Sequence, residues 1–270
     1  MNLFYQGHPW AYSNLACLEA KKHVNIEISN IQWLPDFKSV WEKIWDNSLW
    51  LIPLENSYAG NIHENFYNFL RYDYKVIWIV NLEVHHCLLS NETNLSKIKK
   101  VYSHPQALDQ CHDYLKSHNI IPEIYSDTAG SAKMISENKI SWVWAIASSL
   151  AADIYNLNSI DSSIQDQKWN TTRFFLIAPQ NLELQYWDIK NKTSIIFEAK
   201  NIASSLYKCL WAFATNNVNL TKIESLPSLK DPFTYLFWID FEWTSADINV
   251  QNALEELKYF TKTVKIVWEY

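Results

Sequence analysis

Short apolar segments alternate with amphipathic helical patterns through the first two thirds of this 270-residue chain. We predict strands near residues 2–6, 49–54, 76–84, 121–126, 141–146 and 172–178. Between them, apolar residues recur with helical spacing at Ile62, Phe66, Phe69 and Leu70, and again at Ala107, Leu108, Cys111 and Leu115. This alternation predicts an α/β fold with a largely parallel sheet.

The pattern changes after the polar, aperiodic segment 179–191, which we interpret as a linker. The remaining chain predicts, in order, a strand at 193–198, a helix at 201–215, strands at 218–224 and 233–241, a helix at 246–260 and a strand at 263–268. This βαββαβ order is typical of a ferredoxin-like unit. We therefore expect two domains, at 1–180 and 190–270.

Composition excludes several classes of protein. The formal net charge is −6 and the lysines are scattered, so we expect no nucleic-acid partner. No apolar run approaches the roughly 20 residues that cross a bilayer, so we expect no membrane segment. The four cysteines lie far apart and the first residues lack the pattern of a secretion signal, which favours the cytoplasm.

Polar residues follow the predicted strands at four loop-to-helix junctions: GHPWAYS at 7–13, ENSYAG at 55–60, SHPQ at 103–106 and DTAGSA at 127–132. In an open α/β sheet such junctions line the crevice where ligands bind. Each is also an ordinary helix-capping sequence, as in Ser103 followed by Pro105. A fifth polar segment, NTTRF at 170–174, contains Arg173, one of only two arginines.

Taken together, these segments resemble the prephenate dehydratases that carry a C-terminal ACT regulatory domain. The resemblance rests on YQGHPWAYS at 5–13, IPLENS at 52–57, HHCLL at 85–89, YSHPQALDQC at 102–111, residues 128–132, YNL at 155–157, NTTRF at 170–174 and NLTKIES at 219–225. It implies a bilobal catalytic region similar to type II periplasmic binding proteins. The second lobe would span about 80–155, with the active cleft between the lobes, and an ACT domain would follow.

The resemblance also implies a reaction, the decarboxylating dehydration of prephenate to phenylpyruvate in phenylalanine biosynthesis. Such chemistry needs hydrogen-bond donors for a leaving hydroxyl and two carboxylates, and it needs no cofactor and no metal. Arogenate as the substrate and a non-catalytic small-molecule sensor remain alternatives. A decayed, inactive enzyme is a third.

By the same resemblance, Thr172 assists departure of the ring hydroxyl. Glu55 is either the proton source or a solvated carboxylate, and the two interpretations stand about even. The other expected substrate-binding residues are Asn56, Ser57, Ser103, Gln110, Thr128 and Arg173. Ser103 and Gln110 are seven residues apart, so on one helix they would face the same cleft.

Several residues can be interpreted as structural or as functional. We favour a structural hydrogen-bonding role over a general-base role for His85 and His86, and for His104. Arg173 either binds a substrate carboxylate, which we slightly favour, or pins its strand to an acidic side chain. Cys87 and Cys111 are expected in the core.

The regulatory half departs from the family pattern at two places. Ser204, Ser205 and Leu206 replace a Gly-Ala-Leu motif, and the run Glu224, Ser225, Leu226, Pro227 replaces Glu-Ser-Arg-Pro. In the family these motifs hold phenylalanine at an ACT dimer interface, and here Ser204, Leu206, Glu224 and Ser225 occupy the regulatory positions. We predict a retained fold with a reduced or absent response to phenylalanine, in a homodimer or tetramer.

The chain has 3 glycines and 14 tryptophans. Six tryptophans stand where the family pattern usually has glycine: Trp10, Trp45, Trp50, Trp78, Trp243 and Trp268. A shared cause would be a codon, plausibly UGA, written as tryptophan that the source cell reads as glycine. We then expect some of these tryptophans in turns, exposed, or at positive φ, which bulky residues avoid. A true Trp10 would instead crowd the site.

Overall fold

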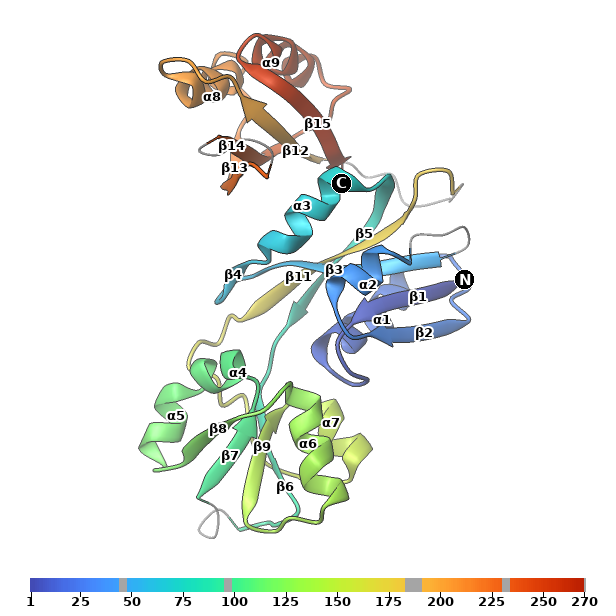
Figure 1. Cartoon of the computed structure of the whole chain (residues 1–270), viewed down its shortest axis with the longest axis vertical. Coiled ribbons are helices and arrows are strands. Elements are labelled where there is room, and N and C mark those ends of the chain that lie inside the picture. The colour runs from blue at the N-terminus through green and yellow to red at the C-terminus, as the bar shows by residue number, and fades with distance from the viewer. Residues whose placement is uncertain (44–47, 95–98, 183–190, 230–233, 270) are drawn as a thin grey trace. The chain divides into compact units, whose positions relative to one another are not determined.

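The computed structural model describes residues 1–43, 48–94, 99–182, 191–229 and 234–269 (Figure 1). The chain divides into two compact units, Met1–Glu183 and Leu184–Tyr270. Within the described residues, no helix has both the length and the apolar character needed to span a membrane. Most of the predicted linker at 179–191 falls outside the described residues, as does Trp45.

The first unit contains two sheets. The first sheet has the strand order β2-β1-β3-β11-β5, with β4 beside β3. Its strands are β1 (Asn2–Gln6), β2 (Asn30–Leu34), β3 (Ser48–Asn56), β4 (Gly60–Asn61), β5 (Tyr74–Glu83) and β11 (Thr171–Pro179). The helices that accompany it in the chain are α1 (Tyr12–His23), α2 (Phe37–Trp41) and α3 (His63–Arg71).

The second sheet of this unit has the order β10-β6-β9-β7-β8. Its strands are β6 (Cys87–Ser90), β7 (Lys100–Ser103), β8 (Ile121–Ile124), β9 (Val143–Ala147) and β10 (Asn158–Ser162). Its helices are α4 (Pro105–Gln110), α5 (His112–Ser117), α6 (Thr128–Glu137) and α7 (Ser149–Tyr155). β6, β7 and β10, of four or five residues each, were not predicted from the sequence.

The sheets are mixed, so the prediction of a largely parallel sheet was wrong. β1 pairs in parallel with β2 and β3, and β7 pairs in parallel with β8 and β9. β11, however, lies antiparallel to both β3 and β5, and β6 lies antiparallel to β9 and β10. The reason is that β11 re-enters the first sheet from the second, in the direction opposite to β5.

The chain passes twice between the two sheets (Figure 1). Residues 84–86 lead from β5 to β6, and residues 163–170 lead back from β10 to β11. The two crossovers are hydrogen-bonded to each other. The Val84 amide donates to the Asn170 carbonyl over 2.8 Å, and the Ile164 amide donates to the His86 carbonyl over 3.0 Å.

Apolar side chains fill both halves of this unit. Every residue of β9 is buried, and Cys111 and Cys87 lie in the two clusters that pack against the second sheet, as expected. Around the first sheet, the rings of Trp41, Phe69 and Phe175 stack edge to face, with centroids 5.2 and 5.6 Å apart. Burial of these large rings stabilises the sheet that carries β3 and β11.

The second unit has the predicted βαββαβ order. Its elements are β12 (Lys192–Ala199), α8 (Ser205–Thr215), β13 (Leu220–Pro227), β14 (Tyr235–Glu242), α9 (Ile248–Lys258) and β15 (Thr261–Glu269). All its strands pair antiparallel in the order β13-β14-β12-β15, which is ferredoxin-like. Of the expected regulatory residues, Ser204 precedes α8 at a φ of 61°, Leu206 lies in α8, and Glu224 and Ser225 lie on β13.

Four of the tryptophans singled out in the sequence lie at a positive φ or beside an irregularity in strand pairing. Trp10 has a φ of 72° and Trp243 a φ of 76°, so the expectation of positive φ is confirmed at these two. Trp78 and Trp268 each flank a register shift in the strand pairing, of β5 with β11 and of β15 with β12. Trp50 is fully buried, and among the described residues its indole nitrogen has no acceptor.

Candidate functional site

Asn56 and Thr172 form the centre of the candidate site. They are cross-strand partners at the ends of β3 and β11. The Asn56 side-chain nitrogen donates to Thr172 Oγ1 over 2.9 Å. The Asn56 side-chain oxygen accepts the backbone amides of Tyr58 and Ala59, at 3.0 and 2.8 Å, because the chain turns tightly after β3. These two backbone hydrogen bonds fix the orientation of the buried Asn56 amide.

A buried chain of hydrogen bonds runs from Asn56 towards the second sheet. Asn56 Nδ2 donates to Asn170 Oδ1 over 2.7 Å, and Asn170 Nδ2 donates to Gln110 Oε1 over 2.9 Å. The same Gln110 oxygen lies 2.7 Å from His86 Nε2. All four side chains are less than 10% exposed.

Tyr12, from α1, ends this chain of hydrogen bonds. Its hydroxyl lies 2.7 Å from the His85 carbonyl oxygen and 3.0 Å from His86 Nδ1. Burial lowers the pKa of His86 to about 4, more than its hydrogen bond to Gln110 raises it, so the imidazole is neutral at neutral pH. Burial also raises the pKa of Tyr12 well above its usual range. The side chains of this hydrogen-bonded network are therefore uncharged at neutral pH.

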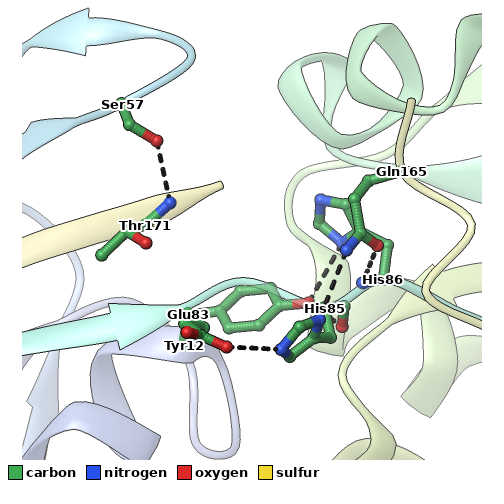
Figure 2. A network of polar contacts seen from close by, with 7 residues as sticks. All are labelled: Tyr12, Ser57, Glu83, His85, His86, Gln165 and Thr171. Carbon is green, nitrogen blue, oxygen red and sulfur yellow. Dashed lines mark hydrogen bonds and ion pairs between the residues drawn. The ribbon is translucent and has the colours of Figure 1, made fainter. Parts of the chain in front are cut away.

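Figure 2 shows how the two crossovers meet at His85, His86 and Gln165. The backbone amide of His86 donates to Gln165 Oε1 over 3.0 Å, and Gln165 Nε2 lies 3.3 Å from His85 Nδ1. His85 Nε2 in turn lies 3.1 Å from a Glu83 carboxylate oxygen at the end of β5. His85 is half exposed on this path, whereas His86 is buried. The histidine pair thus ties the crossovers together.

Ser57 joins the ends of β3 and β11. Its hydroxyl donates to the Trp169 carbonyl over 2.9 Å and accepts the Thr171 amide over 2.9 Å, the second of these shown in Figure 2. Its own amide donates to the Thr171 carbonyl. Ser57 therefore holds Asn170 and Thr171 against the turn that follows Asn56.

Glu55 and Arg173 lie on the other face of the first sheet. They are also cross-strand partners, and Arg173 Nη1 lies 2.8 Å from Glu55 Oε1. Successive side chains of a strand point to opposite faces, so this ion pair points away from Asn56 and Thr172. Of the two interpretations of Arg173, the structure shows the pairing with an acidic side chain. The structure brings Thr172 together with Asn56, and not with Glu55.

Ser103 is placed differently from the expectation. It lies in β7, fully buried, and its hydroxyl donates to the Ile146 carbonyl over 2.6 Å. The helix begins only at Pro105, and His104 is its N-cap, with Nδ1 accepting the Gln106 amide. The expected shared helical face of Ser103 and Gln110 is therefore wrong, because Ser103 belongs to a strand.

Thr128 begins α6, directly after Asp127. Asp127 is the N-cap and accepts the Gly130 amide over 2.7 Å. One Asp127 oxygen also lies 3.5 Å from His8 Nε2, and the His8 ring stacks on Trp33 with centroids 5.0 Å apart. Thr128 is half-buried beside this contact between the loop after β1 and the second sheet.

Asn170, Tyr12 and Gln165 belong to the polar network, although none of them was predicted from the sequence to have a role. Asn170 opens the NTTRF segment and Tyr12 lies in GHPWAYS, so their positions in the motifs were the available signal. Gln165 lies in no motif and gave no signal. No three His, Cys, Asp or Glu side chains of the described residues come together as a metal site.

Comparison with known proteins places this site in a family context. The family model described as prephenate dehydratase matches residues 3–182. A relative named arogenate dehydratase/prephenate dehydratase 2 from Arabidopsis thaliana is 37% identical over 98% of this chain and 71% of its own. A relative named prephenate dehydratase from Methanocaldococcus jannaschii is 36% identical over 89% of this chain and 87% of its own.

Solved structures give the same picture of the whole chain. The prephenate dehydratase from Staphylococcus aureus has a TM-score of 0.84 and 25% identity, with all of both chains covered. A protein described as GqqA, a novel type of quorum-quenching acylase, has a TM-score of 0.85 and 28% identity over 100% of this chain and 97% of its own. The fold is thus shared by proteins described with different activities.

Proposed function

Because the chain belongs to the prephenate dehydratase family, we propose that its first unit converts prephenate to phenylpyruvate, carbon dioxide and water. The observation that carries this proposal is the pair of buried Asn56 and half-buried Thr172, with the Thr172 hydroxyl oxygen held by an amide donor. A positioned hydroxyl of this kind suits a reaction in which a ring hydroxyl leaves.

The reaction needs one proton and no redox partner. The bond between the quaternary ring carbon and its carboxylate breaks, and its electron pair enters the ring. The ring carbon–oxygen bond breaks at the opposite position, and the hydroxyl takes up a proton to leave as water. The aromatic ring that forms supplies the driving force, so the protein has to orient the substrate and support the leaving oxygen.

Thr172 is the residue that we assign to the leaving hydroxyl. Its oxygen already accepts a hydrogen bond from Asn56, and it is half-buried rather than sealed in the core. A threonine is a weak acid, so its role is donation of a hydrogen bond and not delivery of a free proton. Asn56 orients it.

We propose a structural role for Glu55 in place of a role as proton source. Its carboxylate is paired with Arg173 on the sheet face opposite to Thr172. We propose that this pair stabilises the ends of β3 and β11, and so acts on the reaction through the placement of their residues. Ser57 and Thr128 remain proposed substrate contacts, whereas the buried Ser103 hydroxyl serves the second sheet.

The test is a phenylpyruvate-formation assay with purified protein. Prephenate and arogenate are assayed side by side, since the relatives carry both names and the two compounds differ in a keto or an amino group. We expect turnover of prephenate and its loss in Thr172→Ala with unchanged folding. Binding of prephenate without turnover of either compound would favour the non-catalytic sensor.

We propose that the second unit is an ACT regulatory domain. Its βαββαβ order and antiparallel sheet support this assignment. ACT units usually pair side by side, so we propose a homodimer or a tetramer, to be measured by light scattering. Four free, buried cysteines are consistent with an enzyme of the cytoplasm.

A further inference from the structure

The side chains that join the two sheets form a hydrogen-bonded chain with a fixed direction. The direction is set at Asn56, whose side-chain oxygen accepts two backbone amides, from Tyr58 and Ala59. A backbone N–H can only donate, so the Asn56 nitrogen has to face Thr172 and Asn170. No choice of amide orientation is left at this position.

The direction passes from one side chain to the next. Because Asn56 donates to Asn170 Oδ1, the Asn170 nitrogen has to face Gln110. Two amide nitrogens cannot donate to each other, so Gln110 presents its oxygen. That oxygen lies 2.7 Å from His86 Nε2, which therefore has to carry a hydrogen.

His86 then has one defined tautomer. The buried, neutral ring carries its single hydrogen on Nε2, and Nδ1 is an acceptor. Nδ1 lies 3.0 Å from the Tyr12 hydroxyl, whose single hydrogen is shared between Nδ1 and the His85 carbonyl oxygen, 2.7 Å away. The backbone amides of Tyr58 and Ala59 thus determine the tautomer of His86, which lies in the crossover from β5 to β6.

We propose that Asn170, Gln110 and His86 are positioning residues that hold the Asn56 amide in place, because Asn170 Oδ1 accepts the second hydrogen of Asn56 Nδ2, and that Asn56 in turn keeps Thr172 a hydrogen-bond donor towards the substrate. The proposal rests on the function assigned to Thr172 above. Thr172 Oγ1 accepts the Asn56 N–H, and within the described residues its own hydrogen has no acceptor. A hydroxyl whose oxygen accepts a hydrogen bond is a stronger donor, so the chain both directs and strengthens this donation.

The first experiment determines the His86 tautomer by nitrogen NMR of protein labelled with ¹⁵N-histidine. The His86 signals are identified by their disappearance in His86→Gln. We expect a protonated Nε2 and an unprotonated Nδ1 at neutral pH. A hydrogen on Nδ1 would overturn the proposal, and this readout does not depend on catalytic activity.

The second experiment reverses the direction with Asn170→Asp. At alkaline pH the new carboxylate accepts only, so Gln110 has to turn its nitrogen towards it and also towards His86. We expect the His86 hydrogen to move from Nε2 to Nδ1. Asn252→Asp, on an exposed position of α9, adds the same charge and should leave the tautomer unchanged. A tautomer that stays on Nε2 in Asn170→Asp contradicts the proposal.

The third experiment measures the effect on catalysis. Asn170→Ala should lower kcat roughly tenfold with little change in KM, because Thr172 loses orientation while the substrate contacts stay. An unchanged kcat would show that the chain does not position Thr172. If the expected tautomer is found and the wild-type protein does not turn over prephenate, the proposed function fails and the direction of the chain stands.

A second inference rests on a separate observation, the backbone of Trp10 and Trp243. Both have φ near 75°, a region in which an L-residue with a bulky side chain is strained. Glycine adopts this region without that strain. At Trp243 the conformation is held by hydrogen bonds from its amide to the Asn191 carbonyl and from Thr193 Oγ1 to its carbonyl.

Three further tryptophans occupy positions that suit glycine. Trp78 and Trp268 flank register shifts in their strands, where glycine is common, and the buried Trp50 nitrogen lacks an acceptor among the described residues. We infer that the natural protein carries glycine at these five positions, through a codon that the source cell translates as glycine.

Peptide mass spectrometry of the protein isolated from its own cells tests this inference. We expect glycine in the peptides that cover positions 10, 50, 78, 243 and 268. Tryptophan at Trp10 or Trp243 in native material would overturn the inference, because the shared cause requires both to be glycine.

Discussion

Asn56 and Thr172 lie directly opposite each other on antiparallel strands, and the amide of the first donates to the hydroxyl oxygen of the second over 2.9 Å. The amide is held in turn by two backbone N–H groups. The hydroxyl that we assign to the reaction is therefore attached to the sheet backbone through one rigid side chain, which suits a group that has to be oriented before the substrate arrives.

Removal of this hydroxyl should abolish most of the activity. We expect Thr172→Ala to lower kcat by about 10²- to 10³-fold, the range for loss of one oriented donor. Thr172→Ser keeps the hydroxyl and should retain most turnover. Thr171→Ala is the matched control, since that side chain points to the opposite face of the sheet. Equal rates for Thr172→Ala and the wild-type protein would remove Thr172 from the mechanism.

The ion pair of Glu55 and Arg173 should prove structural. We expect Glu55→Gln and Arg173→Gln each to lower the free energy of unfolding by about 1 kcal/mol, the range for a partly exposed pair. The double variant should lose less than the sum of the two losses, because both single changes break the same contact. Denaturant melts measure the cycle. A large rise in KM confined to Arg173→Gln would favour the substrate-carboxylate interpretation instead.

Stability should decrease in mild acid because of His86. The unfolded chain binds a proton at this residue near pH 6.5, whereas the folded protein does so only near pH 4. Unfolding therefore takes up a proton between these values, and the free energy of unfolding falls as the pH falls, by about 3 kcal/mol in total. The contribution is fully present above pH 6.5.

Two variants isolate this contribution. His86→Gln should be less stable at neutral pH but should lose less stability between pH 6.5 and 4 than the wild-type protein. His85→Gln, at the neighbouring, half-exposed histidine, is the control. Urea melts across this range measure both, and identical slopes for His86→Gln and the wild-type protein would contradict a neutral, buried His86.

The response to phenylalanine should be reduced or absent. Ser204 stands at a φ of 61°, where glycine would fit without strain, and Leu226 stands where the family motif has arginine. We expect prephenate turnover to change little over a phenylalanine titration. Strong inhibition would show that the second unit binds the amino acid without these two residues.

Glycine at position 10 or 243 should stabilise the protein. Relief of the strained φ is worth roughly 1–2 kcal/mol, and the entropy of the unfolded glycine offsets about 0.5–1 kcal/mol of that. We therefore expect Trp10→Gly and Trp243→Gly to raise the midpoint of thermal unfolding. Trp33→Gly, in β2, is the control and should lower it, because Trp33 lies in a strand and stacks on His8.

Sequence reasoning succeeded where one local pattern determined the outcome. The second unit follows the predicted element order because its strands and helices of eight to eleven residues carry a clear period. The first unit was harder, since the direction of β11 depends on a path through a separate sheet. No local pattern encodes whether a strand enters parallel or antiparallel to its neighbours.

Part of the candidate site was likewise predictable from the sequence and part was not. Asn56, Gln110 and Thr172 were identified from motifs, and the structure brings them into one network. The placement of Glu55 was not predictable from its neighbour Asn56, because it depends on which face of β3 each residue occupies. The connecting role of Asn170 became visible only with the hydrogen bonds between the two sheets.

The two crossovers also define the architecture of the first unit as an insertion. Since Val84 and Asn170 are hydrogen-bonded neighbours, a turn of a few residues would connect β5 and β11 as a hairpin and delete the entire second sheet. Asn56, Asn170 and Thr172 would remain in such a shortened protein, whereas Gln110 and His86 would be lost. The hydroxyl that we assign to the reaction and the amide that orients it thus belong to the host sheet, and Gln110 and His86, which support that amide through Asn170, belong to the inserted module.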